Sequence, residues 1–207
     1  MQQIRQRSLS IADSLGYRIN ENLPLLEERV TIAQSVQDIV HRMLAIYIVA
    51  AVAYGFDRKK ALGWLTQNVS TRALTMKECR FLKEGEGAPD GFKYQIEGLW
   101  AFFWSCSLVE DCEFSFARRC PEDFALRLPD LNSGQKASEV FRSSKIRDID
   151  EIVSMADLAY CVHWSVRDAE LQGSRSTPLP YYVVVERRRA FEWLLGGYDW
   201  ENISLDT

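Results

Sequence analysis

The chain has 207 residues, of which 47% are hydrophobic and 12% aromatic, and its 25 Lys and Arg residues against 29 Asp and Glu residues give a formal net charge of −4. This composition is that of a globular protein, and it excludes the disordered, collagen-like and membrane classes. The charge excludes nucleic acid as a direct, primary ligand, because phosphate binding needs clustered cations, and it favours a basic partner. At this length we expect one core and a single domain over residues 1–207.

The first long helical pattern covers residues 27–54. Its apolar residues recur at helical spacing up to Ile48 and are continuous through Ala53, so the second half of this helix is expected at the centre of the core. The longest uncharged run, residues 43–56, is shorter than the roughly 20 residues that a membrane-spanning helix needs. Asp57 is a suitable N-cap for a second helix through Asn68, and the two helices form a predicted hairpin.

The middle of the chain begins with a capping box. Thr75, followed three residues later by Glu78, predicts the start of a helix that runs to about Lys83 and ends at a glycine-rich loop. Residues 92–109 are dense in apolar and aromatic side chains and are expected to be nearly buried. The next stretch, 110–133, is poorly periodic, which predicts irregular structure with one helical turn near residues 123–126.

Two helices are predicted in the C-terminal part. Residues 148–172 carry a broad apolar stripe and are followed by Gly173, and a last helix is expected from Pro180 to about Leu195, where Gly196 and Gly197 follow. No segment shows convincing strand alternation, and no internal repeat is present. The predicted fold class is therefore all-α: a mainly helical single domain with orthogonal or bundle-like packing, and a small irregular or β element between residues 110 and 135.

Several motifs together resemble one protein family. They are Arg7-Ser8, Leu23-Pro24, Leu74-Thr75 with Glu78, Glu97-Gly98-Leu99-Trp100 with Trp104, Asp157-Leu158-Ala159-Tyr160 with His163-Trp164 and Asp168-Ala169, Glu186-Arg187-Arg188-Arg189-Ala190 with Trp193-Leu194, and Trp200 with Asp206-Thr207. With these the chain resembles the bacterial domain-of-unknown-function family 4272 over nearly its whole length. It departs from the family pattern at Cys161, where an arginine is expected, and at Glu192, where an asparagine is expected. The resemblance implies a helical fold and a bacterial origin, and it supplies no catalytic residues.

Polar side chains gather on the last two predicted helices. A base such as His163, together with an arginine that faces an anionic group, is the minimal equipment for acid/base chemistry. Asp157 and His163 are separated by about 600° of helix rotation, however, so they cannot pair within one helix. We therefore favour an ionic lattice between the two helices over a site. The set comprises Asp157, His163, Arg167, Asp168, Glu186, Arg187 and Arg188.

Two further groups of charges lead to structural expectations. Glu97 lies among aromatic residues, and it is expected to pair with Arg42 or another arginine, because an unpaired buried charge is costly; the alternative is an acid of raised pKa in a pocket. The segment after Gly197 carries only acidic charges, so it is expected to fold back onto the arginines of the last helix.

The motifs of common enzyme and metal sites are missing from the sequence. It has no G-x-S-x-G, no H-E-x-x-H, no phosphate-binding glycine loop and no C-x-x-C, and it contains two histidines and five cysteines. We therefore expect no catalytic residues, no metal and no cofactor, and a non-enzymatic role is favoured. No signal-peptide pattern follows the polar N-terminal residues, which predicts a cytoplasmic location without membrane association.

Two functions remain open. The favoured one is a protein-binding module, with a basic partner contacted by Glu110, Asp111 and Glu113 in the irregular segment. By analogy with proteins that mask basic active sites, it would be an immunity protein that neutralises a secreted bacterial toxin such as a nuclease effector. The alternative is an enzyme or binding protein for a small anionic ligand, with Arg187 or Arg188 as the anchor and His163 or Glu97 as the acid/base.

Overall fold

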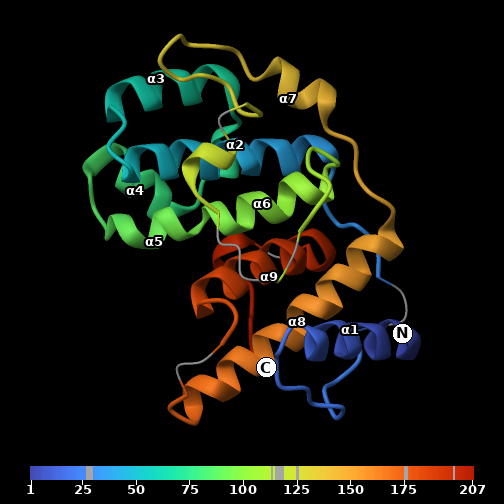
Figure 1. Cartoon of the computed structure of the whole chain (residues 1–207). Helices are drawn as coiled ribbons and strands as arrows, with labels where there is room; N and C mark the ends of the chain where they lie inside the picture. Colours follow the sequence, from blue (N-terminus) through green and yellow to red (C-terminus); the bar gives the residue numbers. More distant parts are fainter. Residues whose placement is uncertain (27–29, 113, 115–118, 125, 175–176, 198) are drawn as a thin grey trace.

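The computed structural model describes the whole chain except residues 27–29, 113, 115–118, 125, 175–176 and 198 (Figure 1). None of the described residues forms a strand, which confirms the all-α class. Between residues 110 and 135 the described part is irregular and contains a 3₁₀ turn. The helices are α1 (Gln2–Ser14), α2 (Val36–Ala53), α3 (Arg58–Asn68), α4 (Met76–Glu84), α5 (Pro89–Tyr94), α6 (Ile96–Ser105), α7 (Ser138–Ser143), α8 (Ile149–Leu171) and α9 (Tyr181–Gly196), with 3₁₀ turns η1 (Thr71–Ala73), η2 (Pro121–Phe124) and η3 (Trp200–Asn202).

Helix ends that are set by local side chains lie where the sequence predicts them. Asp57 caps α3 by accepting the backbone N–H of Lys60 at 2.8 Å. Thr75 and Glu78 form both halves of the capping box of α4, and this helix ends at Gly85 with φ 81°. Because each end depends on residues within one turn, the sequence is sufficient to locate it.

The predicted start of the central helix at residue 27 is wrong. The helix α2 begins at Val36, where Ser35 is the N-cap and accepts the N–H of Asp38. The preceding residues are held by another helix instead, because the backbone N–H of Ala33 donates to the carbonyl of Leu194 in α9 at 2.8 Å. A contact 161 positions along the chain (194 − 33) has therefore replaced the intrahelical bond that the apolar spacing suggested.

The sequence patterns did not predict α1 or α7, and α5 begins at Pro89 within the stretch expected to be a glycine-rich loop. α7 is one short helix, and α1 is a longer one without an apolar stripe: its buried residues are Arg5, Ser8 and Ala12. A helix that buries an arginine and a serine carries little hydrophobic periodicity, so the pattern did not reveal it. In the structure α1 lies along α8 (Figure 1).

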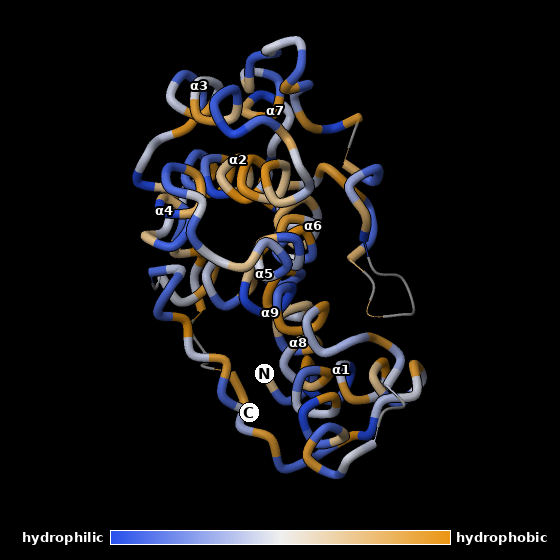
Figure 2. The backbone as a smooth tube through the Cα atoms, turned by 90° about the vertical axis from the view of Figure 1, so that its left-hand side faces the viewer, coloured by the Kyte–Doolittle hydropathy of each residue, from blue (hydrophilic) through white to orange (hydrophobic). Residues whose placement is uncertain are grey.

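The core is built around α2 and α6. Every residue of α6 is buried, and α6 packs between α2 and α9, while α9 also packs on α8. The tube of Figure 2 shows the apolar character of α2 in the upper part of the molecule, with α1 and α8 below it. By length and composition α2 could cross a membrane, a test that buried core helices also pass, and most of it is covered by other elements.

Candidate functional site

The predicted polar residues of α6 and α9 form a buried ion pair. The Nε and Nη2 atoms of Arg187 donate to Oε2 of Glu97 at 3.0 and 2.8 Å, and the two residues are 0% and 1% exposed. The second carboxylate oxygen of Glu97 accepts the backbone N–H of Arg119 at 2.6 Å. Of the partners expected for Glu97, the structure selects Arg187 and leaves Arg42 for another acid.

Asp157 of α8 pairs with a residue of the unpredicted helix α1. The guanidinium of Arg5 contacts both carboxylate oxygens of Asp157, at 2.7 to 3.2 Å. The same guanidinium donates to the carbonyls of Leu23 and Pro24, each at 2.8 Å. One buried arginine thus ties α1, α8 and the segment that follows α1 together.

Arg188 joins α8, α9 and the C-terminal segment. Its Nη1 lies 2.6 Å from Nδ1 of His163, and its Nε donates to Glu192 at 3.1 Å. Its two Nη atoms also donate to the carbonyls of Leu205 and Asp206 at 3.0 and 3.1 Å. The segment does return to the last helix, but backbone carbonyls rather than the expected carboxylates make the contact.

The remaining predicted residues do not join this group. Arg167 is paired with Glu170 one turn along the same helix, at 3.2 Å, and Asp168 is paired with the exposed Arg18 at 2.6 Å. Glu186 is paired with Arg189 at 3.4 Å. Burial raises the pKa of Glu186 against the opposing effect of that arginine. The predicted set is therefore divided among separate pairs and does not converge on one point.

His163 makes stability depend on pH. Burial, with help from Arg188 and Arg167, lowers its pKa from 6.5 to about 3. Because the unfolded chain binds a proton more readily, the stabilisation is fully present above pH 6.5 and is lost as the pH falls from 6.5 towards 3. Between pH 6.5 and 5 the wild type is expected to lose up to about 1.4 kcal/mol of unfolding free energy per pH unit through this group. Urea unfolding at a series of pH values measures the slope.

The matched variant is His163→Asn, whose side-chain oxygen can replace Nδ1 as the acceptor for Arg188 without titrating. The difference in unfolding free energy between the variant and the wild type should therefore change in favour of the variant as the pH falls. Parallel pH profiles for the two proteins would show that His163 is not the titrating group.

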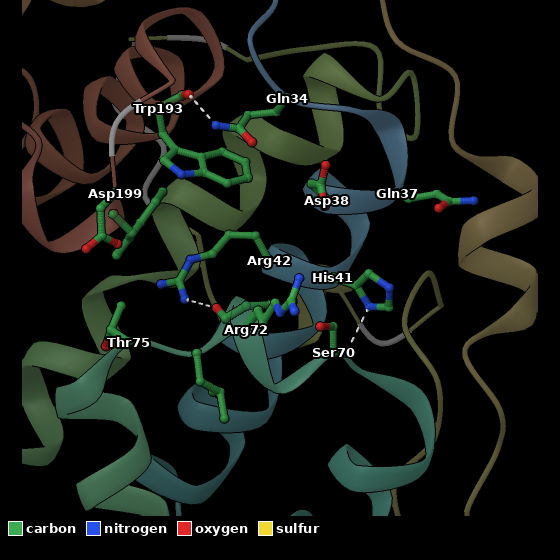
Figure 3. A pocket seen from close by; sticks show the side chains of 13 residues that line it. Gln34, Gln37, Asp38, His41, Arg42, Ser70, Arg72, Thr75, Trp193 and Asp199 are labelled. Atoms are coloured by element: carbon green, nitrogen blue, oxygen red, sulfur yellow. Dashed lines mark hydrogen bonds between the residues drawn. The ribbon is translucent and has the colours of Figure 1, made fainter.

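A separate cavity of about 380 Å³ lies where α2, η1, the start of α4 and the end of α9 meet (Figure 3). None of the predicted polar residues lines it. Its walls combine arginine, carboxylate, amide and hydroxyl groups with two indole rings. The lining residues are Gln34, Gln37, Asp38, His41, Arg42, Ser70, Arg72, Ala73, Leu74, Thr75, Trp193, Asp199 and Trp200.

Arg42 forms part of the cavity wall and is held by a second buried ion pair. Its two Nη atoms donate to the two carboxylate oxygens of Glu78, each at 2.7 Å, and Nη1 also donates to the carbonyl of Ala73 at 2.7 Å. Burial disfavours the charge of Glu78, but Arg42 and Thr75 outweigh it and lower the pKa of this carboxyl. The guanidinium stacks on the ring of Trp200 at 4.3 Å.

Sequence reasoning missed this cavity for a clear reason. Its walls come from four segments, and the one local signal among them, the capping box at Thr75 and Glu78, indicates a helix start. The unusual feature that could have drawn attention is Arg42, a charged residue on the otherwise apolar face of a core helix.

The acidic residues proposed to contact a partner lie at the surface. The side chain of Glu110 is 95% exposed and 3.9 Å from Arg147, and Asp111 is also exposed. Glu113 lies outside the described residues. These acids are therefore accessible from solvent, in contrast to the buried ion pairs.

The His, Cys, Asp and Glu side chains of the described residues were compared with the needs of a metal site and of a reactive thiol. No group of three or more His, Cys, Asp or Glu side chains there could hold a metal ion. Burial raises the pKa of Cys106 and Cys161 to about 12 and that of Cys112 to about 11, so these thiols are protonated at neutral pH.

Comparison with known proteins gives one match. The sequence model of the family described as "Domain of unknown function (DUF4272)" matches residues 4–203. No curated protein and no solved structure matches the chain.

Proposed function

The chain belongs to the DUF4272 family, and because that family's description names no activity, we propose from the residues themselves that the protein is a non-enzymatic module that binds a basic protein. The contact surface is formed by the described residues of segment 107–136, with the exposed acids Glu110 and Asp111 near the start of that segment. The partner class is a basic bacterial toxin, which the protein neutralises as an immunity protein by covering it.

The observation that carries the proposal is that scaffold side chains hold the backbone carbonyls on both sides of Glu110, while the side chains of Glu110 and Asp111 are exposed. Trp100 donates its indole N–H to the carbonyl of Asp111 at 3.0 Å, and Arg147 donates to the carbonyl of Val109 at 2.8 Å. Glu110 lies between these two anchored residues. A surface that is ordered before binding loses less conformational entropy on association.

The other end of the segment is anchored in the same way. Tyr47 donates its hydroxyl to the carbonyl of Pro129 at 2.8 Å, and Trp64 donates its indole N–H to the carbonyl of Gln135 at 2.7 Å. Between the anchors, Leu126 is 96% exposed. The same segment therefore exposes acids, which can steer a basic partner, and an apolar side chain, which can be desolvated on binding.

The alternative, a small anionic ligand bound by the last helices, is weakened by the contacts of its two proposed anchors. Arg187 and Arg188 are buried, and their guanidinium groups are engaged by Glu97 and by His163, Glu192 and the C-terminal carbonyls. A ligand would have to displace these contacts. These buried charges are therefore better explained as contacts that hold the helices and the C-terminal segment together.

The test is a charge reversal at the two exposed acids of the segment. The double variant Glu110→Lys/Asp111→Lys should bind the basic partner at least about tenfold more weakly, because like charges then face each other across the interface. The tagged chain is co-expressed with the product of its neighbouring gene, and capture, affinity and rescue of growth are measured.

The matched control is Glu84→Lys/Glu86→Lys, which reverses two exposed acids, one at the last residue of α4 and one just after it. Both double variants change the formal net charge from −4 to 0 (−4 + 4). Equal affinities of the two variants would contradict the proposed surface, and purification of the native protein as a lone species at low salt would contradict the binding role.

A further inference from the structure

One arginine that lines the cavity beside Arg42 has no ion-pair partner among the described residues. Arg72 is exposed, and among the described residues no hydrogen-bond or ion-pair partner is found for it. Arg42, in contrast, is neutralised by Glu78, although its buried Nε–H has no acceptor in the described part of the chain. The cavity wall therefore holds one cation, Arg72, that is not paired with a carboxylate in the described part of the chain.

Carboxylates line the same cavity. Figure 3 shows Asp38 on the side of Gln34 and Trp193, with His41 and Arg72 on the side of Ser70. Asp38 accepts a hydrogen bond from the Ser35 hydroxyl through one oxygen, so its other oxygen is available. Asp199 accepts from Asn202 at 3.3 Å through Oδ2. With Arg42 neutralised by Glu78, the lining keeps charges of both signs: Arg72 on one hand and Asp38 and Asp199 on the other.

The apolar part of the lining is aromatic. Trp193 and Trp200 are mostly buried, and their rings meet edge to face at 6.1 Å with an interplanar angle of 73°. The carbonyls at this end of α9 are already used, because Gln34 donates to Trp193 and Ala33 donates to Leu194. The two indoles supply the aromatic part of the lining, with the Arg42 guanidinium over one ring, that of Trp200.

We propose that this cavity binds a small zwitterion, a free amino acid with an apolar or aromatic side chain, with its carboxylate on Arg72 and its ammonium group on Asp38. Opposite charges on the lining exclude a simple anion or cation as the best ligand, because each would meet one repelling group. The volume of about 380 Å³ is that of a small-molecule site. This site is independent of the docking segment, since none of its lining residues lies within residues 107–136.

The test uses three related probes: L-phenylalanine, its amide, which lacks the carboxylate, and its N-acetyl derivative, which lacks the ammonium group. Binding is followed by NMR through the assigned indole N–H signals of Trp193 and Trp200. L-phenylalanine should shift both signals saturably, and each derivative should bind about tenfold more weakly, because each loses one charge-assisted interaction.

Two variants test which protein side chain binds the carboxylate of the ligand and which binds its ammonium group. Arg72→Gln should abolish the preference for L-phenylalanine over the amide, and Asp38→Asn, which keeps an acceptor for Ser35, should abolish the preference over the N-acetyl derivative. Arg142→Gln, at an exposed position in α7, is the control and should retain both preferences. The proposal is overturned if L-phenylalanine gives no saturable shift up to its solubility, if all three probes bind equally, or if the control variant behaves as Arg72→Gln does.

Discussion

Replacing Glu97 with glutamine is expected to lower the free energy of unfolding by about 3–5 kcal/mol, because it removes the carboxylate from a buried guanidinium. Arg187 is completely buried and directs two nitrogens at Glu97 Oε2. The glutamine oxygen can still accept the backbone N–H of Arg119, which Glu97 binds at 2.6 Å. The expected loss of stability therefore comes from removing the negative charge beside Arg187 and not from losing the hydrogen bond to Arg119. Urea unfolding at pH 7 measures it.

Asp168→Asn is the control for this prediction. Its partner Arg18 has a side chain that is 62% exposed, and exposed ion pairs contribute about 0–1 kcal/mol. The double variant Glu97→Gln/Arg187→Met, which removes both buried charges, should recover part of the loss of the single variant. A loss for Glu97→Gln as small as that for Asp168→Asn would contradict the structural role assigned to the pair.

Replacing Glu78 with alanine is expected to have an effect of the same size, about 3–5 kcal/mol, because both Nη atoms of Arg42 lose their carboxylate in the core. The side chain of Arg42 is 2% exposed and that of Glu78 1%. Glu78 also closes the capping box by accepting the N–H of Thr75 at 2.9 Å. The change therefore affects the start of α4 as well as the wall of the cavity. Thermal and urea unfolding measure the effect.

Thr75→Ala separates the cap from the ion pair. It removes the side-chain acceptor for the N–H of Glu78 but leaves the pair with Arg42 in place, so it should cost only about 1 kcal/mol. If the two variants lose the same stability, the cap accounts for the whole effect and the Arg42–Glu78 pair contributes nothing measurable.

The sequence was sufficient for the parts of the fold that depend on neighbouring residues. The starts of α3 and α4 follow from Asp57 and Thr75, which bond to backbone groups three residues away. The long apolar stripe of α8 and the Pro180 and Gly196-Gly197 signals at the ends of α9 are likewise local patterns. The apolar periodicity predicted a helix at Ala33, and this was wrong, because the backbone N–H of Ala33 donates to the carbonyl of the distant Leu194 instead.

The ion pairs and the cavity join residues that are far apart in the sequence, and a local sequence pattern does not indicate which residues will meet. Sequence reasoning correctly required an arginine for Glu97, but several arginines were available, and the pair that forms joins residues 90 positions apart. The pairing of Arg5 with Asp157 was not predicted, because the helix that carries Arg5 has no apolar stripe and gives no sign that one of its faces is buried. The cavity beside Arg42 was missed because its residues come together only when α2, α4 and α9 are packed.

The contact between Arg5 and Asp157 also has a consequence for the order of events during synthesis. The two residues are 152 positions apart, so at about 5–20 residues per second α1 leaves the ribosome roughly 8–30 s before its partner on α8 exists. Until then α1 has a charged residue where a core-facing apolar side chain would normally promote early docking. Although α1 emerges before α2 to α9, it is therefore among the last of these helices to find its place, and the core around α2 and α6 can assemble before α1 closes against α8.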